Sequence, residues 1–91
     1  MQIILYSKPG CHLCEGLQEK LETIIQMGNI PSLQLEIRDI MTRDDWFGAY
    51  EYEVPVLFWS RDNNEDNLQP IPRPSPRITV QKLEQILQKY L

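Results

Sequence analysis

A pair of cysteines lies between a short apolar run and an amphipathic helical pattern near the start of the chain. Residues 2–6 are almost continuously apolar, as expected of a strand buried on both faces. After the pair Cys11 and Cys14, apolar side chains recur at helical spacing, at Leu13, Leu17, Leu21 and Ile24. With the next strand, this pattern predicts a βαβ unit with parallel strands and a right-handed crossover.

Two further strands are predicted in the middle of the chain. Residues 33–38 alternate between apolar and polar side chains, so we place this strand at an edge of the sheet. Residues 54–59 are almost continuously apolar and predict a second inner strand. Between them, Thr42 is predicted to cap a helix that completes a second crossover. The apolar stripe of this helix is assigned to the core and contains Trp46, Phe47 and Tyr50.

The last third of the chain predicts another edge strand and a terminal helix. A polar turn at residues 61–67 precedes a short strand at 68–73, whose prolines confine it to an edge. Thr79 is predicted to cap the helix that follows. The whole order, βαβαββα, predicts one α/β domain over residues 1–91. We expect a four-stranded mixed sheet in the order 2-1-3-4, with the last strand antiparallel and helices on both faces, which is a thioredoxin-like fold.

Charge and hydropathy narrow the class of protein. The chain has 13 acidic and nine basic residues, a net charge of −4, and no cluster of Lys and Arg that could follow a phosphate backbone, so nucleic acid is not an expected partner. No apolar stretch approaches the roughly 20 residues of a membrane span, and the first residues lack the pattern of a signal peptide. We therefore expect a cytoplasmic protein that is not bound to a membrane, and a monomer is its expected state.

The cysteine pair is the candidate reactive site. At the start of a helix, unpaired backbone N–H groups and the helix dipole favour negative charge, so the pKa of Cys11 is expected to lie below that of a free thiol. Cys11 is the candidate nucleophile, and Cys14, nearly one turn further on the same face, is the candidate resolving thiol. A stable disulfide or two buried thiols are the structural alternative. With two cysteines and one histidine, the chain is not expected to hold zinc alone, whereas a metal site shared between two copies stays open.

Two segments resemble the active-site landmarks of glutaredoxins, which belong to the thioredoxin superfamily. The first is Tyr-Ser-Lys-Pro-Gly-Cys-His-Leu-Cys at residues 6–14, and the second is Glu-Val-Pro-Val at residues 53–56. The small size of the chain resembles the bacterial glutaredoxin-like branch. The resemblance implies a cis peptide bond before Pro55, a Val54 backbone that is free to pair with an extended substrate, and a Lys8 side chain near the thiolate and the carboxylate of glutathione.

The same resemblance implies a thiol-disulfide oxidoreductase that acts on protein or small-molecule disulfides through Cys11 and Cys14. Its candidate substrate-binding residues are Lys8, His12, Val54 and Pro55. His12, charged part of the time near neutral pH, is also a candidate for stabilising the thiolate. No permanently bound cofactor and no metal are expected, glutathione is a possible co-substrate, and glutathione or a thioredoxin reductase system would restore the dithiol.

The chain departs from glutaredoxins in two places. His-Leu stands between the cysteines where Pro-Tyr is usual, and no glycine follows Gly48, so the Gly-Gly-x-Asp sequence that contacts glutathione in that family is missing. Arg73 and Arg77 occupy the corresponding region, either as solvated side chains or as anchors for a carboxylate. The alternative function is therefore a non-catalytic thioredoxin-fold module that holds a partner protein or a metal at the cysteines, or that uses them as a redox sensor.

Overall fold

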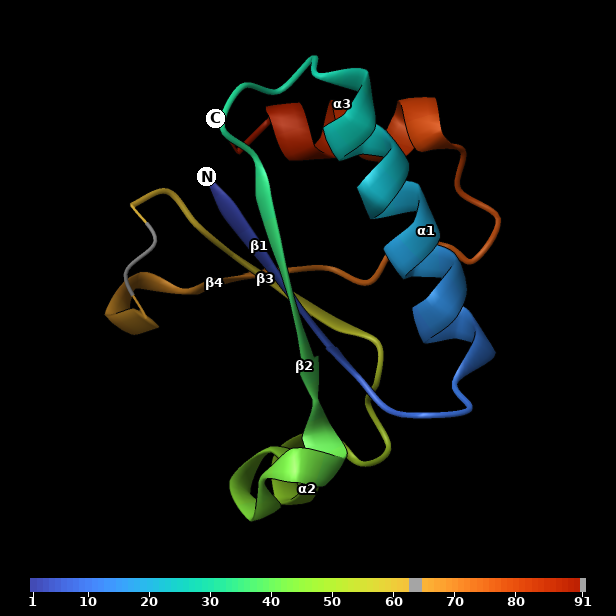
Figure 1. The fold of residues 1–91 in the computed structure, drawn as a ribbon, viewed down its shortest axis with the longest axis vertical. Helices are drawn as coiled ribbons and strands as arrows, with labels where there is room; N and C mark the ends of the chain where they lie inside the picture. The colour runs from blue at the N-terminus through green and yellow to red at the C-terminus, as the bar shows by residue number, and fades with distance from the viewer. Residues whose placement is uncertain (63–64, 91) are drawn as a thin grey trace.

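Within residues 1–62 and 65–90, which the computed structural model describes, four strands form one mixed sheet in the order β2-β1-β3-β4 (Figure 1). The strands are β1 (Gln2–Ser7), β2 (Gln34–Asp39), β3 (Val56–Ser60) and β4 (Gln69–Ile71). β2 pairs in parallel with β1, and β4 pairs antiparallel with β3. The predicted order and the inner positions of β1 and β3 are confirmed. Asn63 and Asn64, in the predicted polar turn, lie outside the described residues.

The prediction of a second crossover is wrong, because β3 runs antiparallel to β1. After β2 the chain passes through the 3-10 turn η1 (Ile40–Thr42) and α2 (Asp44–Tyr50), and β3 then begins at the same end of the sheet where β2 finishes. A helix of seven residues is about 10 Å long. It cannot return the chain along a six-residue strand, which is about 20 Å long.

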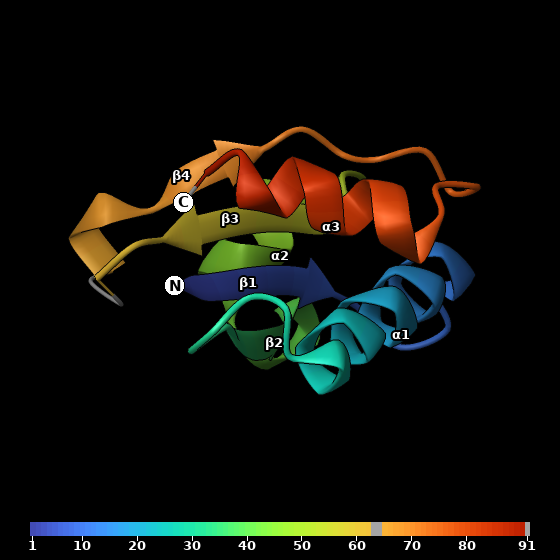
Figure 2. The same ribbon diagram turned by 90° about the horizontal axis from the view of Figure 1, so that it is seen from above.

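The helices cover both faces of the sheet, as predicted. α1 (His12–Met27) and α3 (Val80–Gln88) lie on one face and α2 lies on the other (Figure 2). Because side chains alternate along β1, this strand contributes to both cores. The larger core, under α1 and α3, contains Ile3, Leu5, Leu17, Leu21, Ile24, Leu57, Leu83 and Leu87. The smaller core, under α2, is built on Ile4, Tyr6 and Ile40, with Trp46, Phe47 and Tyr50 packed against it.

Two of the helix ends match the sequence pattern and one does not. Gly28 ends α1 in the left-handed conformation, at φ 73°, which glycine adopts without strain. The Thr79 hydroxyl accepts the Lys82 N–H at 3.1 Å and caps α3 as predicted. Thr42, however, does not cap α2. The Asp39 carboxylate accepts the Met41 N–H and starts η1, so that Thr42 becomes the last residue of that turn, and Arg43 precedes α2 without a side-chain cap.

No helix among the described residues combines the length and the apolar character needed to cross a lipid bilayer.

A buried arginine, which the sequence pattern did not reveal, joins β2 to the segment before β4. Arg38 is only 9% exposed, and its guanidinium donates to both carboxylate oxygens of Glu65 at 2.7 Å each. It also donates to the Tyr6 hydroxyl at 2.9 Å and to the Glu36 carboxylate. Its positive charge lies 5.4 Å from the centre of the Trp46 ring. The bond from Arg38 lowers the pKa of the Glu65 carboxyl below its ordinary value.

Replacing Glu65 with glutamine is expected to destabilise the protein at neutral pH by about 1 kcal/mol, since the Glu65 end of the pair is largely exposed to water. A carboxyl whose pKa is lowered by folding stabilises the fold above its unfolded pKa, and this contribution is lost as the pH falls through its folded pKa. Urea unfolding should therefore show a difference between E65Q and the natural protein that shrinks with acidification. The exposed Glu22 on α1 supplies the control, E22Q, and an equal loss in both variants would contradict the prediction.

Candidate active site

Cys11 forms the N-cap of α1. The chain leaves β1 at Ser7 and turns through Gly10, at φ 78°, before Cys11 adopts an extended conformation. The Cys11 sulfur accepts the backbone N–H of Cys14 at 3.2 Å, in the place where a serine or aspartate oxygen usually caps a helix. This N–H and the helix dipole both point toward the Cys11 sulfur and favour negative charge on it.

The two cysteines form a disulfide, with a distance of 5.2 Å between their Cα atoms. Their exposure differs: Cys14 is 2% exposed and belongs to the buried residues, whereas Cys11 is only partly buried. A molecule that arrives from solvent therefore reaches the Cys11 sulfur first. The structure thus separates an accessible sulfur from a protected one within a single turn of helix.

The segment before β3 lies opposite the cysteines and contains a cis peptide bond between Val54 and Pro55. Pro55 is buried, and it lines the same groove as His12 and Leu13, the two residues between the cysteines. The Val54 N–H donates to the Tyr50 carbonyl at 3.2 Å. The expectation that the Val54 backbone is free is thus wrong for its N–H group, because the turn after α2 brings the Tyr50 carbonyl within reach.

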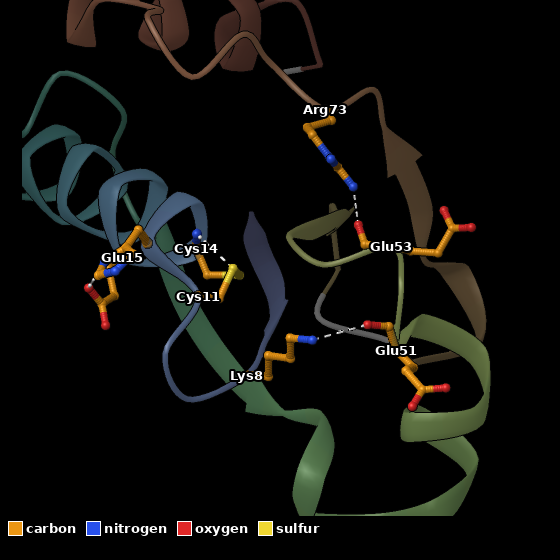
Figure 3. The surroundings of a disulfide bond; sticks show 8 residues. Lys8, Cys11, Cys14, Glu15, Glu51, Glu53 and Arg73 are labelled. Atoms are coloured by element: carbon orange, nitrogen blue, oxygen red, sulfur yellow. Dashed lines mark hydrogen bonds and ion pairs between the residues drawn. A yellow bond between two sulfur atoms is a disulfide. The ribbon is translucent and has the colours of Figure 1, made fainter.

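Two cations hold the turn that precedes Val54 (Figure 3). The Lys8 ammonium donates to the Glu51 carbonyl at 3.4 Å, and the Arg73 guanidinium donates to the Glu53 carbonyl. Figure 3 shows Lys8 extending past the disulfide toward Glu51, and Arg73 reaching toward Glu53 from the chain after β4. Lys8 therefore lies beside the cysteine pair, as the resemblance implies, but its bond goes to the backbone on the other side of the site.

His12 points into solvent. Its side chain is 94% exposed, and its Nδ1 lies 3.6 Å from a carboxylate oxygen of Glu15, one turn along α1. When His12 is protonated, the negative charge of Glu15 opposes its effect on the neighbouring sulfur.

A groove runs from the residues between the cysteines along α1, facing the chain after β4. Apolar side chains form most of its walls, among them Leu13, Leu17, Pro55 and Ile78. The cations Lys20 and Arg73 also line it, whereas Arg77 does not. Sequence reasoning missed Lys20, although Leu13, Leu17 and Lys20 are spaced at i, i+4 and i+7 and therefore share one face of α1.

Among the described residues, no group of three or more His, Cys, Asp or Glu side chains is placed to hold a metal ion.

The chain is similar to known proteins in sequence and in structure. A family model described as glutaredoxin-like domain (DUF836) matches residues 2–88. The structure is similar to that of thioredoxin 1 from the thermophilic eubacterium Thermosipho africanus TCF52B, with a TM-score of 0.64 and 14% sequence identity over 99% of this chain and 93% of that chain. At that identity the likeness shows the fold alone, which is the thioredoxin fold. A search of curated proteins gives no match. Since the family model covers nearly the whole sequence, the chain belongs to the glutaredoxin-like domain family.

Proposed function

We propose that this protein is a thiol-disulfide oxidoreductase whose reactive thiolate is Cys11. The observation that carries the proposal is the bond from the Cys14 N–H to the Cys11 sulfur at the start of α1. In the reduced protein the same N–H and the helix dipole favour the Cys11 thiolate, the form that attacks disulfides. Lys8, on the turn just before Cys11, adds a positive charge to the same side of the molecule.

The proposed exchange has two steps. The Cys11 thiolate attacks one sulfur of a substrate disulfide, the substrate S–S bond breaks, and the other half of the substrate leaves as a thiolate that takes up a proton. The Cys14 thiol then loses its proton and attacks the Cys11 sulfur, which releases the second half of the substrate as a thiol and leaves the Cys11–Cys14 disulfide. Two electrons pass from the protein dithiol to the substrate. The burial of Cys14 supports this order, since outside disulfides do not reach it first.

The substrate is proposed to lie across Pro55, with a segment paired to the Val54 carbonyl. A substrate that also used the Val54 N–H would have to displace the Tyr50 carbonyl from it. The closed disulfide is the form that an external reductant must open. Two molecules of glutathione, or a thioredoxin reductase system, are the proposed sources of the two electrons.

We propose that the protein works in the cytoplasm as a monomer, on protein or small-molecule disulfides, and without a permanently bound cofactor. The presence of only two cysteines supports this location, since small secreted domains are usually dense in disulfides.

Alkylation of the reduced protein should modify Cys11 and spare Cys14. At about pH 7 an ordinary thiol with a pKa of about 8.5 is mostly protonated and reacts slowly, whereas a stabilised thiolate at Cys11 reacts quickly. Iodoacetamide labelling followed by peptide mass mapping gives the site and the rate. The C11S variant should lose the fast reaction. Equal rates at the two cysteines, or a Cys11 rate no faster than that of free cysteine, would contradict the proposed role.

Equilibration in glutathione redox buffers, with acid quenching and intact mass measurement, should show a dithiol and an intramolecular disulfide that interconvert. A potential near the glutaredoxin range of about −200 to −230 mV is expected. In C14S, which cannot close the disulfide, a glutathione adduct should accumulate at Cys11, and C11S should form none there. If both cysteines stay reduced and free of adducts throughout, the oxidoreductase proposal fails, and a non-catalytic binding module takes its place.

A further inference from the structure

The groove beside the cysteines begins where a bound substrate must lie. His12 and Leu13, between the two cysteines, form one end of it, and Pro55 contributes from the opposite side. A polypeptide joined to the Cys11 sulfur therefore has its neighbouring residues at the mouth of this groove. From His12 to Lys20 the groove follows α1 for about 12 Å, at 1.5 Å per residue. That length matches three or four residues of an extended chain, at about 3.3 Å each.

The walls of the groove are apolar and partly open to water. Leu13 is 49% exposed, although it stands on the first turn of α1 beside the reactive sulfur. Leu17, Pro55 and Ile78 continue the same apolar surface. Covering such a surface with an apolar side chain is favourable, by about 25 cal/mol for each Å² removed from water.

Two positive charges lie along this apolar groove without a carboxylate partner among the described residues. The Lys20 ammonium donates to the Pro76 carbonyl at 2.9 Å, and the Arg73 guanidinium donates to the Glu53 carbonyl. Both acceptors are neutral, so neither bond offsets the charge. An ammonium carries three donors and a guanidinium five, so each cation retains donors for a further acceptor. Two such cations, set beside apolar walls, favour a partner that carries both a negative charge and an apolar side chain.

We infer that the groove binds an acidic segment of a substrate protein, with an apolar side chain against Leu13 and Leu17 and a carboxylate of Asp or Glu held by Lys20 and Arg73. This inference rests on the proposed function, because the segment is placed by its bond to Cys11. Arg73 serves as the carboxylate anchor together with Lys20, while Arg77 lies outside the groove.

The test measures how fast the reduced protein attacks short peptides that carry one cysteine as a 2-pyridyl disulfide. The Cys11 thiolate forms a mixed disulfide with the peptide sulfur, and pyridine-2-thione leaves and is followed by its absorbance. The peptides have blocked ends, with leucine and glutamate on both sides of the cysteine. Two comparison peptides carry glutamine or lysine in place of each glutamate. We expect the glutamate peptide to react about fivefold faster than the glutamine peptide, the size of effect that exposed ion pairs give. The preference should fall as salt is added.

Charge-removing variants locate the effect. Lys20→Gln and Arg73→Gln remove the positive charge and keep a polar side chain, so each should reduce the preference for glutamate. Lys20→Glu should favour the lysine peptide instead. The matched controls are Arg77→Gln and Lys82→Gln, which remove a positive charge outside the groove and should keep the preference. The control variants Arg77→Gln and Lys82→Gln should react like the natural protein with the pyridyl disulfide of N-acetylcysteine amide, which has no side chain to place in the groove. Its rate with each Lys20 and Arg73 variant serves as the reference by which the peptide rates of that variant are divided.

The outcomes separate this inference from the proposed function. If the natural protein reacts with the glutamate, glutamine and lysine peptides at one rate, or if the control variants lose the preference as well, the inference is overturned and the oxidoreductase stands. If the natural protein attacks none of the disulfides, the proposed function fails. Binding of a peptide to the groove is then measured without any reaction at Cys11. A glutamate peptide with serine in place of cysteine should then shift the backbone amide resonances of Leu13, Lys20 and Arg73. Absence of those shifts, or equal shifts with the lysine peptide, overturns the inference.

Discussion

Burial of β1 on both faces is the constraint on which the rest of the structure depends. Ile3 and Leu5 point into the core under α1 and α3, while Ile4 and Tyr6 point into the core under α2. Burying a side chain of this size stabilises a fold by at most about 1.5 to 3 kcal/mol. This value is an upper bound because the unfolded chain already buries part of its apolar surface. β1 also pairs with both β2 and β3. Its carboxyl end, and therefore the start of α1 at Cys11, is fixed by both cores at once.

The other half of the site depends on the same strand through Tyr6. The Tyr6 ring lies 4.5 Å from the ring of Tyr50, and its hydroxyl accepts from the buried Arg38. Tyr50 ends α2, and its carbonyl accepts the N–H groups of Glu53 and Val54, which places the turn before Pro55. One face of β1 thus positions the cis peptide bond, while its carboxyl end positions the cysteines. The cysteines and the cis peptide bond are both positioned by the same strand. The packing of β1 in the core therefore sets the distance between the disulfide and Pro55, rather than the loops on which they lie.

Sequence periodicity predicted the elements but not the contacts between distant ones. The strands, the start of α1 and the Thr79 cap follow from local patterns that need only a few neighbouring residues. The prediction that Thr42 caps α2 is wrong because Asp39, three residues earlier, starts the 3-10 turn η1, and Thr42 ends that turn. In the sequence, Arg38 fits the polar face of an edge strand. No neighbouring residue in the sequence indicates that it pairs with Glu65, which lies 27 residues later. The direction of β3 likewise depends on the short span of α2, which an apolar stripe of the same residues does not reveal.

The chain after β4 approaches the cysteine pair and Pro55 without a glycine because long side chains make the contacts. In glutaredoxins a glycine pair lets the backbone itself come close to the ligand, whereas here prolines at positions 72, 74 and 76 fix the backbone and remove its N–H donors. Arg73 reaches from this segment to the Glu53 carbonyl, and Lys20 reaches from α1 to the Pro76 carbonyl. These two bonds hold the segment against the turn before Pro55 on one side and against α1 on the other. Since prolines leave the segment little conformational freedom to lose, the groove is formed before a substrate arrives, and binding costs correspondingly less entropy.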